Sequence, residues 1–416
     1  MKPNSSPNKF PYLLAALTLA AFLGGGTGVA DTDPGHGQEL TYVDTHNHLP
    51  VSSAPGCDLS DVTHNVLTLM DEFAIQKTLI MYPPTSTTSL CPAESLADVV
   101  ERHPDRFAFL GGGESLFPII YSYRNAPPGT VPSDTRKQFE ETAHDLLRLG
   151  AVGFGELAAE HFAFHEGHPY EHVPPDHELY LLLADIAARY RVPIDLHMEA
   201  VPKNFTDPSQ PYAYLTDCSG ARRGDPNPPT LTENISALEH LLAHNREARI
   251  IWVHAGWDNT GYRTVKLARR LLEDHPNPYI QIRPNGLGNR CVPPFSPPRV
   301  LPNSVLDENG DLVPAWRDLI RAFPDRFTVG LDSFYPPEIP EPQVAPFLGS
   351  GLRLLRQLPP DLAWKVGTKN AVRLYNLDRK LICHKPGTPA KKTMWVSADA
   401  FHGHWGHGDE LGPCKP

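Results

Sequence analysis

Two histidines stand two positions apart at the end of a short apolar stretch, residues 41–48 (TYVDTHNH). If this stretch is a β-strand, side chains two positions apart point to the same side, so the imidazoles of His46 and His48 project together. Imidazole is the commonest protein ligand for transition metals. In a chain with 20 histidines one such pair is a weak signal, so the remaining ligands of a metal site must come from other segments.

Four more residues of metal-binding type lie at or near the ends of later apolar segments: Glu156, His197, His254 and Asp332. Each has an ordinary explanation by itself, as a surface acid, a buried core histidine or a turn residue. Together with His46 and His48 they form a nitrogen and oxygen ligand set that suits zinc, or iron, nickel or manganese. Six ligands exceed what one tetrahedral ion needs, so two ions that share a bridging carboxylate would use them better.

The segments that carry these residues are short, apolar and rich in β-branched residues, and helical patterns separate them. We predict eight strands, at residues 41–48, 77–82, 107–110, 151–156, 192–198, 249–254, 279–283 and 327–331. This alternation predicts an α/β fold with a parallel sheet. No glycine-rich phosphate loop follows the first strand, which argues against a dinucleotide-binding fold.

In a (β/α)8 TIM barrel the functional residues lie at the C-terminal ends of the strands, where the candidate ligands are placed here. We therefore predict a TIM barrel over residues 31–378, with long proline-rich loops at its C-terminal mouth. The tail, residues 379–416, is expected to be irregular. It contains a histidine-rich segment, residues 401–407 (FHGHWGH), for which metal binding and a solvated flexible tail are both open.

The first thirty residues have the pattern of a signal peptide. Lys2 and Lys9 precede an apolar run over residues 12–23, and residues 28–30 (GVA) form a small-residue cleavage site. The alternative is a retained N-terminal anchor. Both readings place the folded part outside the cytoplasm, so we expect an exported protein, periplasmic or secreted.

Six cysteines in an exported chain make disulfides plausible, although the sequence alone allows about 15 pairings. We predict that Cys57 pairs with Cys91 and Cys218 with Cys291, each tying loops at the barrel mouth, and that Cys383 pairs with Cys414 in the tail. The alternative for each is a buried free thiol.

Removal of the signal peptide would take two lysines and no acid, and the formal charge would change from −11 to −13. This acidic balance argues against nucleic acid as a partner. We expect a small-molecule substrate and no membrane contact after signal cleavage, while the sequence leaves the oligomeric state open.

At this point the chain resembles the amidohydrolase superfamily, and within it the amidohydrolase-related group. The similar stretches are VDTHNH (43–48), GFGEL (153–157), IDLHME (194–199), IWVHAG (251–256), VGLDS (329–333) and GTKNAVRLYNL (367–377). The resemblance implies a metal-dependent barrel hydrolase. In it His46, His48 and Asp332 bind the metal, and His197 and His254 bind a second ion or the substrate.

One departure from the family concerns the bridging group. Many members with two ions use a carboxylated lysine, whereas this chain offers Glu156, as some other members do. A decarboxylase branch of the superfamily uses one ion and generally lacks an acid at this strand, so Glu156 favours hydrolysis.

We therefore predict a hydrolase that acts on an ester, lactone or amide through a metal-activated water, with one or two divalent ions, zinc foremost. Asp332 would act as the base, and His254 or the second ion would polarise the scissile carbonyl. The alternatives are a metal-dependent decarboxylase and a barrel that binds a metal or ligand without turnover.

The substrate pocket is the least determined feature. Arg283 ends the seventh strand and would hold a substrate carboxylate, unless it pairs with a neighbouring acid. Asn285, Trp257 and Tyr262 are expected to line the same pocket. Asp44 is expected either to orient a ligand histidine or to be a simple acid of the barrel interior.

Overall fold

The fold is taken from a computed structural model, which describes residues 40–49, 55–86, 91–163, 169–206, 227–284, 287–288, 299–335 and 345–415. Three predictions lie outside the described residues: the signal peptide, the Cys218–Cys291 disulfide and the position of Asn285. Within the described residues, no helix is both long enough and apolar enough to span a membrane.

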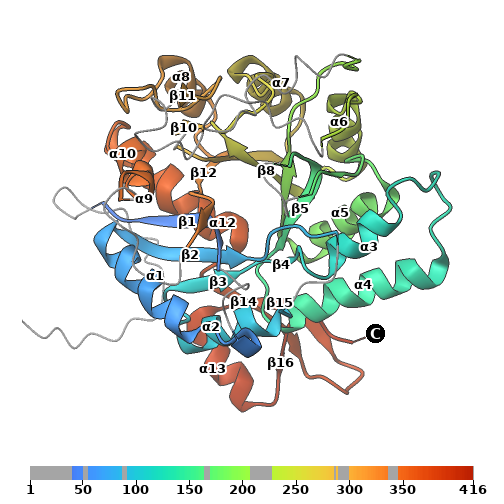
Figure 1. The fold of residues 1–416 in the computed structure, drawn as a ribbon. Coiled ribbons are helices and arrows are strands. Elements are labelled where there is room, and N and C mark those ends of the chain that lie inside the picture. The colour runs from blue at the N-terminus through green and yellow to red at the C-terminus, as the bar shows by residue number, and fades with distance from the viewer. Residues whose placement is uncertain are drawn as a thin grey trace, which may run out of the picture.

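A mostly parallel sheet forms the centre of the molecule, and the eight predicted strands all belong to it (Figure 1). Its strands are β1 (Tyr42–His48), β2 (Ile75–Met81), β3 (Phe107–Phe109), β4 (Gly111–Gly112), β5 (Phe154–His161), β7 (Pro193–Met198), β8 (Arg249–Ala255), β9 (Pro278–Ile282) and β12 (Phe327–Val329). The spatial order is β3-β2-β1-β12-β9-β8-β7-β5-β4. The short strands β13 (Ser333–Phe334) and β6 (Glu171–His172) extend β1 and β5.

The sheet closes into a barrel because β3 and β4 are two halves of one extended segment, interrupted only at Leu110. The first half pairs with β2 and the second with β5, both in parallel. Two further backbone hydrogen bonds join this segment to the chain just before β5, from Val152 N–H to the Phe109 carbonyl and from Gly111 N–H to the Gly153 carbonyl. The ends of the spatial order are therefore one strand, and the predicted TIM barrel is confirmed.

Helices surround the ring of strands on its outside (Figure 1). They are α1 (Ser60–Glu72), α2 (Glu94–Arg102), α3 (Leu116–Ser122), α4 (Ser133–Arg148), α5 (Glu178–Tyr190), α6 (Ile235–His244), α7 (Val265–Asp274), α8 (Pro314–Ala322), α9 (Ala345–Leu348), α10 (Ser350–Leu355) and α11 (Pro360–Trp364). A π-helical turn (Lys365–Lys369) leads from α11 into α12 (Asn370–Tyr375). Each long helix buries one apolar stripe, as α4 does with Phe139, Ala143, Leu146 and Leu147.

A cluster of hydrophobic side chains fills the interior of the barrel, separate from the apolar stripes under the outer helices. It contains side chains from β1, β2, the β3–β4 segment and β8, together with α12: Val43, Leu79, Met81, Ala108, Leu110, Ile251, Val253, Ala371, Leu374 and Tyr375. Because β8 is not a neighbour of β1, β2 or β3 in the sheet, these contacts must cross the barrel interior. Asn370 of α12 donates to the carbonyl of Phe327, the first residue of β12, at 2.8 Å, and Arg249, the first residue of β8, donates to the Leu374 carbonyl at 2.7 Å. Helix α12 therefore closes the end of the barrel opposite the strand C-termini.

The sequence predicted an irregular tail, and this prediction is wrong. It contains β14 (Arg379–His384), β15 (Lys392–Ser397), α13 (Ala398–Gly406) and β16 (Glu410–Leu411), with the three strands in one antiparallel sheet. The hydrophobic periodicity of the sequence did not predict these elements, because the strands carry many polar and charged residues and α13 has no buried side chain. Strand pairing and a few buried apolar side chains, among them Leu381, Ile382 and Val396, hold these segments.

Two of the three predicted disulfides fall within the described residues, and both are confirmed. Cys57 pairs with Cys91, and Cys383 pairs with Cys414. The first joins the loop after β1 to the segment before α2, and the second joins β14 to the C-terminus.

Candidate metal centre

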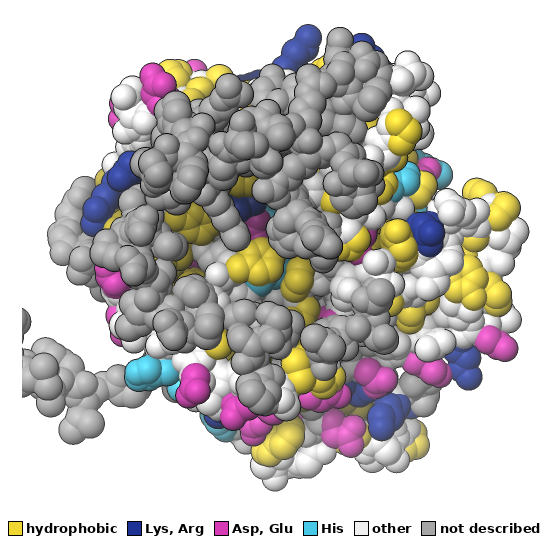
Figure 2. Space-filling model, viewed as in Figure 1, with side chains coloured by type: hydrophobic (Ala, Val, Ile, Leu, Met, Phe, Trp, Pro, Cys, Tyr) yellow, Lys and Arg dark blue, Asp and Glu magenta, His cyan; other side chains and the backbone are white. Residues whose placement is uncertain are grey.

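All six predicted metal ligands lie together in the barrel, five of them at or near the C-terminal ends of strands and Glu156 within β5. They are His46 and His48 of β1, Glu156 of β5, His197 of β7, His254 of β8 and Asp332, which follows β12. All six are buried. In the space-filling view, histidine and acidic side chains are visible near the middle of this face, beside hydrophobic ones (Figure 2).

Glu156 lies between two pairs of histidines. Its Oε2 atom is 3.6 Å from His46 Nε2 and 3.5 Å from His48 Nε2. Its Oε1 atom is 2.8 Å from His197 Nδ1 and 2.9 Å from His254 Nε2. Each carboxylate oxygen thus faces a different pair of imidazoles, which is an arrangement suited to a carboxylate shared by two ions. β5 also continues beyond Glu156 to His161, so the glutamate lies within its strand and not at the strand end as expected.

Asp332 completes the group on the side of His46 and His48. Its Oδ1 atom is 3.2 Å from His48 Nε2 and 4.0 Å from His46 Nε2. Its Oδ2 atom is 3.7 Å from His254 Nδ1. The ligand atoms of His46, His48 and Asp332 all lie within 4.8 Å of one another, and so do those of His46, Glu156 and His254.

Polar groups lie behind the rings of both histidines of β1. His48 Nδ1 is 3.0 Å from the Met81 carbonyl oxygen, so it donates there and leaves Nε2 facing the carboxylates. His46 Nδ1 is 3.6 Å from Asp195 Oδ2, and the Tyr375 hydroxyl donates to Asp195 Oδ1 at 2.9 Å. A carboxylate or carbonyl behind a ligand histidine fixes the ring orientation and makes the other nitrogen a better ligand.

The charges in this pocket fit a cation. Among the described residues the Nε2 atoms of His46 and His48 are buried and make no hydrogen bond. Burial lowers the pKa of an imidazole, but Glu156, Asp195 and Asp332 together raise the pKa of His46 to about 10. The pocket therefore stabilises positive charge beside His46, which a divalent ion would supply. Burial dominates at His254 and lowers its pKa to about 3, so this imidazole is neutral and keeps a lone pair for a ligand.

Two candidate catalytic residues have left-handed backbone conformations, His254 with φ of 66° and Asp332 with φ of 53°. Such conformations are uncommon outside glycine and occur often at functional sites. Gln281 of β9 stabilises this region: its Oε1 accepts from the His254 N–H at 2.6 Å, and its Nε2 donates to the Gly330 carbonyl at 2.5 Å. One side chain thus links the ends of β8, β9 and β12 beside the site.

Arg283 forms an ion pair with Asp332 Oδ2. Its guanidinium also lies 3.9 Å from the centre of the Trp257 ring, as a cation–π contact. The geometry therefore follows the second alternative raised by the sequence, in which Arg283 pairs with a neighbouring acid. Burial raises the pKa of Asp332, but Arg283, His254 and His48 outweigh this effect and hold that pKa well below its usual range.

The other predicted pocket residues are not all at this site. Trp257 lies beside the site, where its ring contacts the Arg283 guanidinium. Tyr262 packs against Phe205, with ring centres 5.4 Å apart, in a separate group of hydrophobic side chains. Asn285 lies outside the described residues.

The sequence left two roles open for Asp44, and the contacts of this residue support the structural one. Its Oδ1 accepts hydrogen bonds from the Leu331 N–H at 2.9 Å and from the His46 backbone N–H at 3.5 Å, so it ties β1 to the chain after β12. The acid that faces the His46 ring is Asp195, which the sequence analysis missed. The signal was present, because Asp195 and His197 are two positions apart on β7 and must point to the same side.

Phe334 is a second residue that the sequence analysis missed. Its ring stacks on His48, with ring centres 4.4 Å apart and planes 29° apart, and 49% of its surface is exposed. An exposed aromatic ring in contact with a candidate metal ligand is available to contact a molecule that enters the barrel mouth. Its only sequence signal is its position two residues after Asp332.

A family model described as amidohydrolase matches residues 120–377, which is more than half of the chain. A search of curated proteins finds no match.

The solved structures that the chain resembles are distant. One is an uncharacterized TIM-barrel protein from Bordetella bronchiseptica, with 15% identity and a TM-score of 0.45, covering 81% of this chain and 99% of that one. Another is a probable 2-pyrone-4,6-dicarboxylic acid hydrolase from Acinetobacter baumannii, with 11% identity and a TM-score of 0.43 over 81% and 100% of the two chains. A third is the aminofutalosine deaminase of Helicobacter pylori, with 11% identity and a TM-score of 0.43 over 81% and 73%.

Proposed function

The chain belongs to the amidohydrolase family, and we propose that it is an exported, metal-dependent hydrolase of a small ester, lactone or amide. The observation that carries this proposal is the position of Glu156 between two pairs of histidines, with Asp332 beside the first pair. A pocket that only binds a ligand has no need of a buried acid next to this set.

The proposed metal site uses the six residues already described. His46, His48 and Asp332 would hold one ion, His197 and His254 a second, and Glu156 would contribute one oxygen to each. Bound there, a divalent ion such as zinc would lower the pKa of a water molecule to near 7 and polarise the scissile carbonyl.

Asp332 is the proposed base. Its Oδ1 faces His48 and its Oδ2 is held by Arg283, so the carboxylate is fixed in orientation and ionised. It would take a proton from the attacking water as the water oxygen bonds to the carbonyl carbon. When the bond from that carbon to the leaving oxygen or nitrogen breaks, Asp332 would return the proton to the leaving group.

Export is supported by chemistry in the described part of the chain. The Cys57–Cys91 and Cys383–Cys414 disulfides suit an oxidising compartment. They agree with the signal-peptide pattern of the first thirty residues.

The proposal is tested by removing the metal with a chelator, adding zinc or manganese back, and measuring turnover of a panel of lactones, esters and amides. We expect hydrolysis that is lost on chelation and restored by metal, and that falls by about 10²–10⁴ in Asp332→Asn. Release of carbon dioxide from carboxylate substrates would indicate the decarboxylase alternative. Metal binding without turnover on any panel member would indicate a binding protein, and hydrolysis indifferent to chelation would contradict the proposal.

A further inference from the structure

The C-terminal unit, residues 379–415, lies on the side of the barrel away from the metal centre. In Figure 1 its strands and α13 lie together in the lower part of the view. The Trp395 indole donates to the Tyr190 carbonyl at 2.9 Å, and Leu411 approaches Gly150. Tyr190 and Gly150 precede the barrel strands β7 and β5. The unit therefore lies against the chain that leads into β5 and β7, on the side opposite the candidate metal centre.

This unit contains a second convergence of metal-binding side chains, outside the barrel. Asp409 Oδ2 is 2.8 Å from His384 Nδ1 and 2.7 Å from His404 Nδ1. Its other oxygen, Oδ1, accepts from the Lys385 N–H at 2.8 Å. The carboxylate side chain is only 3% exposed, whereas the two imidazoles are 30% and 27% exposed. Two imidazole Nδ1 atoms and one oxygen of a buried carboxylate thus lie close together at a place that solvent can reach.

The three residues come from three separate elements. His384 ends β14, His404 lies in the last turn of α13, and Asp409 directly precedes β16. Because α13 has no buried side chain, hydrophobic packing contributes little to its position. His404 links the C-terminal part of this helix to the sheet, through its contact with Asp409 and through its ring contact with His384 of β14, with ring centres 5.5 Å apart. Small units without a sufficient core are commonly stabilised by disulfides or metal ions.

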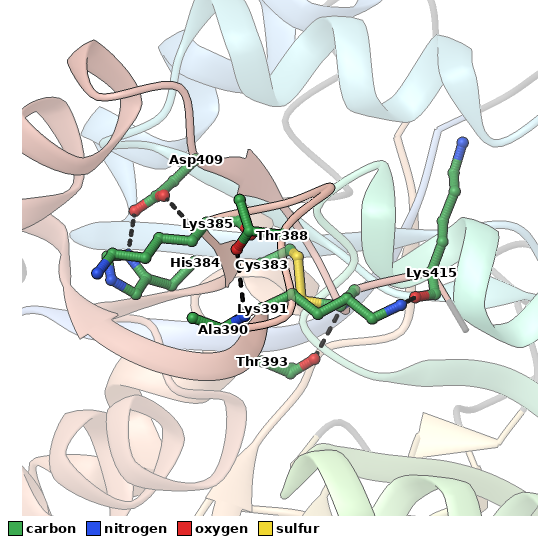
Figure 3. The surroundings of a disulfide bond; sticks show 10 residues. Cys383, His384, Lys385, Thr388, Ala390, Lys391, Thr393, Asp409 and Lys415 are labelled. Carbon is green, nitrogen blue, oxygen red and sulfur yellow. Dashed lines mark hydrogen bonds and ion pairs between the residues drawn. A yellow bond between two sulfur atoms is a disulfide. The ribbon is translucent and has the colours of Figure 1, made fainter.

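The disulfide of this unit is next to the cluster in the sequence. Cys383 and His384 are consecutive residues of β14, so their side chains point to opposite faces of the sheet. Cys383 is 2% exposed and bonds to Cys414. Figure 3 shows His384 beside Asp409 at the left of the view, whereas the disulfide bond of Cys383 lies near the centre. One face of β14 thus carries a covalent link, and the other carries the histidine cluster.

We propose that His384, His404 and Asp409 form a transition-metal site that holds α13 against β14. Two imidazoles and one carboxylate favour zinc, copper(II) or nickel over magnesium or calcium. The metal would replace the protons that the two Nδ1 atoms now direct at Asp409, and water would complete the coordination on the exposed side. This site is independent of the proposed function, because none of its residues belongs to the barrel.

The test compares His404→Gln with His402→Gln, since both histidines lie in α13 but His402 is exposed and lies outside the cluster. Each full-length protein is equilibrated with zinc alone, passed through a desalting column and assayed for zinc per chain. Limited proteolysis is then followed with and without zinc. We expect wild type and His402→Gln to retain one more zinc per chain than His404→Gln, and zinc to protect α13 from cleavage only in the first two.

A second variant, His384→Gln, keeps the result interpretable if His404→Gln folds poorly, because it removes a ligand without altering α13. It should lose the same single equivalent, while a barrel variant such as His48→Gln should keep it. Equal zinc content in wild type, His384→Gln and His404→Gln would overturn the proposal and leave a hydrogen-bonded triad. An equal loss in His402→Gln would mean that zinc binds only to exposed histidines.

Discussion

Arg283 binds the Asp332 oxygen that faces away from His48, so one carboxylate joins the metal centre to a fixed cation. The expectation that Arg283 recognises a substrate carboxylate assumed a guanidinium without an acidic partner nearby. With Asp332 as that partner, Arg283 becomes a residue that orients the base. The Trp257 ring, 3.9 Å from the guanidinium carbon, restricts it further.

Arg283→Met should therefore lower kcat for acidic and neutral substrates alike, by about tenfold or more, with little change in KM. The reason is that Asp332 would lose its fixed orientation, while substrate contacts would be unaffected. Steady-state kinetics on matched acidic and neutral substrates would measure this. A loss confined to acidic substrates would show that Arg283 contacts the substrate after all.

Glu156→Gln should remove at least one metal equivalent from the barrel, because each of its oxygens faces a different pair of histidines. The measurement is elemental analysis in a His404→Gln background, so that the C-terminal unit does not contribute. We expect nearly two equivalents before the change. Glu160→Gln is the matched control, since Glu160 lies in the same strand but bonds to Tyr170 and His172. One equivalent before and after the Glu156 change would make this glutamate a neighbour of the metal site and not a ligand.

Asp195→Asn should weaken metal binding in the barrel by about 10–100-fold, because it removes the carboxylate behind His46. Competition with a chelating dye would measure the affinity. Asp44→Asn is the comparison, since Asp44 accepts hydrogen bonds from the backbone N–H groups of Leu331 and His46 and does not face the His46 ring as Asp195 does. It should affect stability more than affinity, and an equal loss of affinity in both variants would contradict the assignment.

Replacing Cys57 and Cys91 together by alanine should lower the free energy of unfolding by about 2–4 kcal/mol. The bond closes a loop with a sequence separation of 34 residues, which restricts the unfolded chain. Urea unfolding under non-reducing conditions would give the difference. An unchanged midpoint and slope would show that the bond does not stabilise the fold.

Lys77 should make the protein more stable as the pH rises from about 8 towards 10. Burial, with help from Lys380, lowers the pKa of Lys77 to about 8, although its ammonium donates to the Pro104 carbonyl at 2.5 Å. In this interval the unfolded chain keeps the Lys77 proton and the folded chain has lost it, so the free energy of unfolding increases with pH.

The measurement for Lys77 is the free energy of unfolding of wild type and Lys77→Met at pH 7.5, 8.5 and 9.5. The difference between the two proteins should change in favour of wild type as the pH rises, because the methionine variant has no such proton. A difference that stays constant over this interval would rule out a depressed pKa.

The sequence by itself was sufficient for the barrel and for the six candidate ligands. Strands buried on both faces must be short and apolar, so a polar residue at the end of one is conspicuous, as His254 and Asp332 are. Parallel strands in a closed barrel bring their C-terminal ends to one mouth, so the order of these residues along the chain already implied that they meet. The two described disulfides match the predicted pairs, although the sequence alone left about 15 pairings open.

Only the tertiary structure decided which side chains contact each other. The pairing of Arg283 with Asp332, and the choice of Asp195 rather than Asp44 behind His46, depend on ring orientations and strand register, which differ by ångströms and leave no periodic pattern. The order of the C-terminal unit was equally hidden, since its strands carry many polar and charged residues and its helix buries no side chain. His384, His404 and Asp409 meet only because β14, α13 and the segment before β16 fold back on one another.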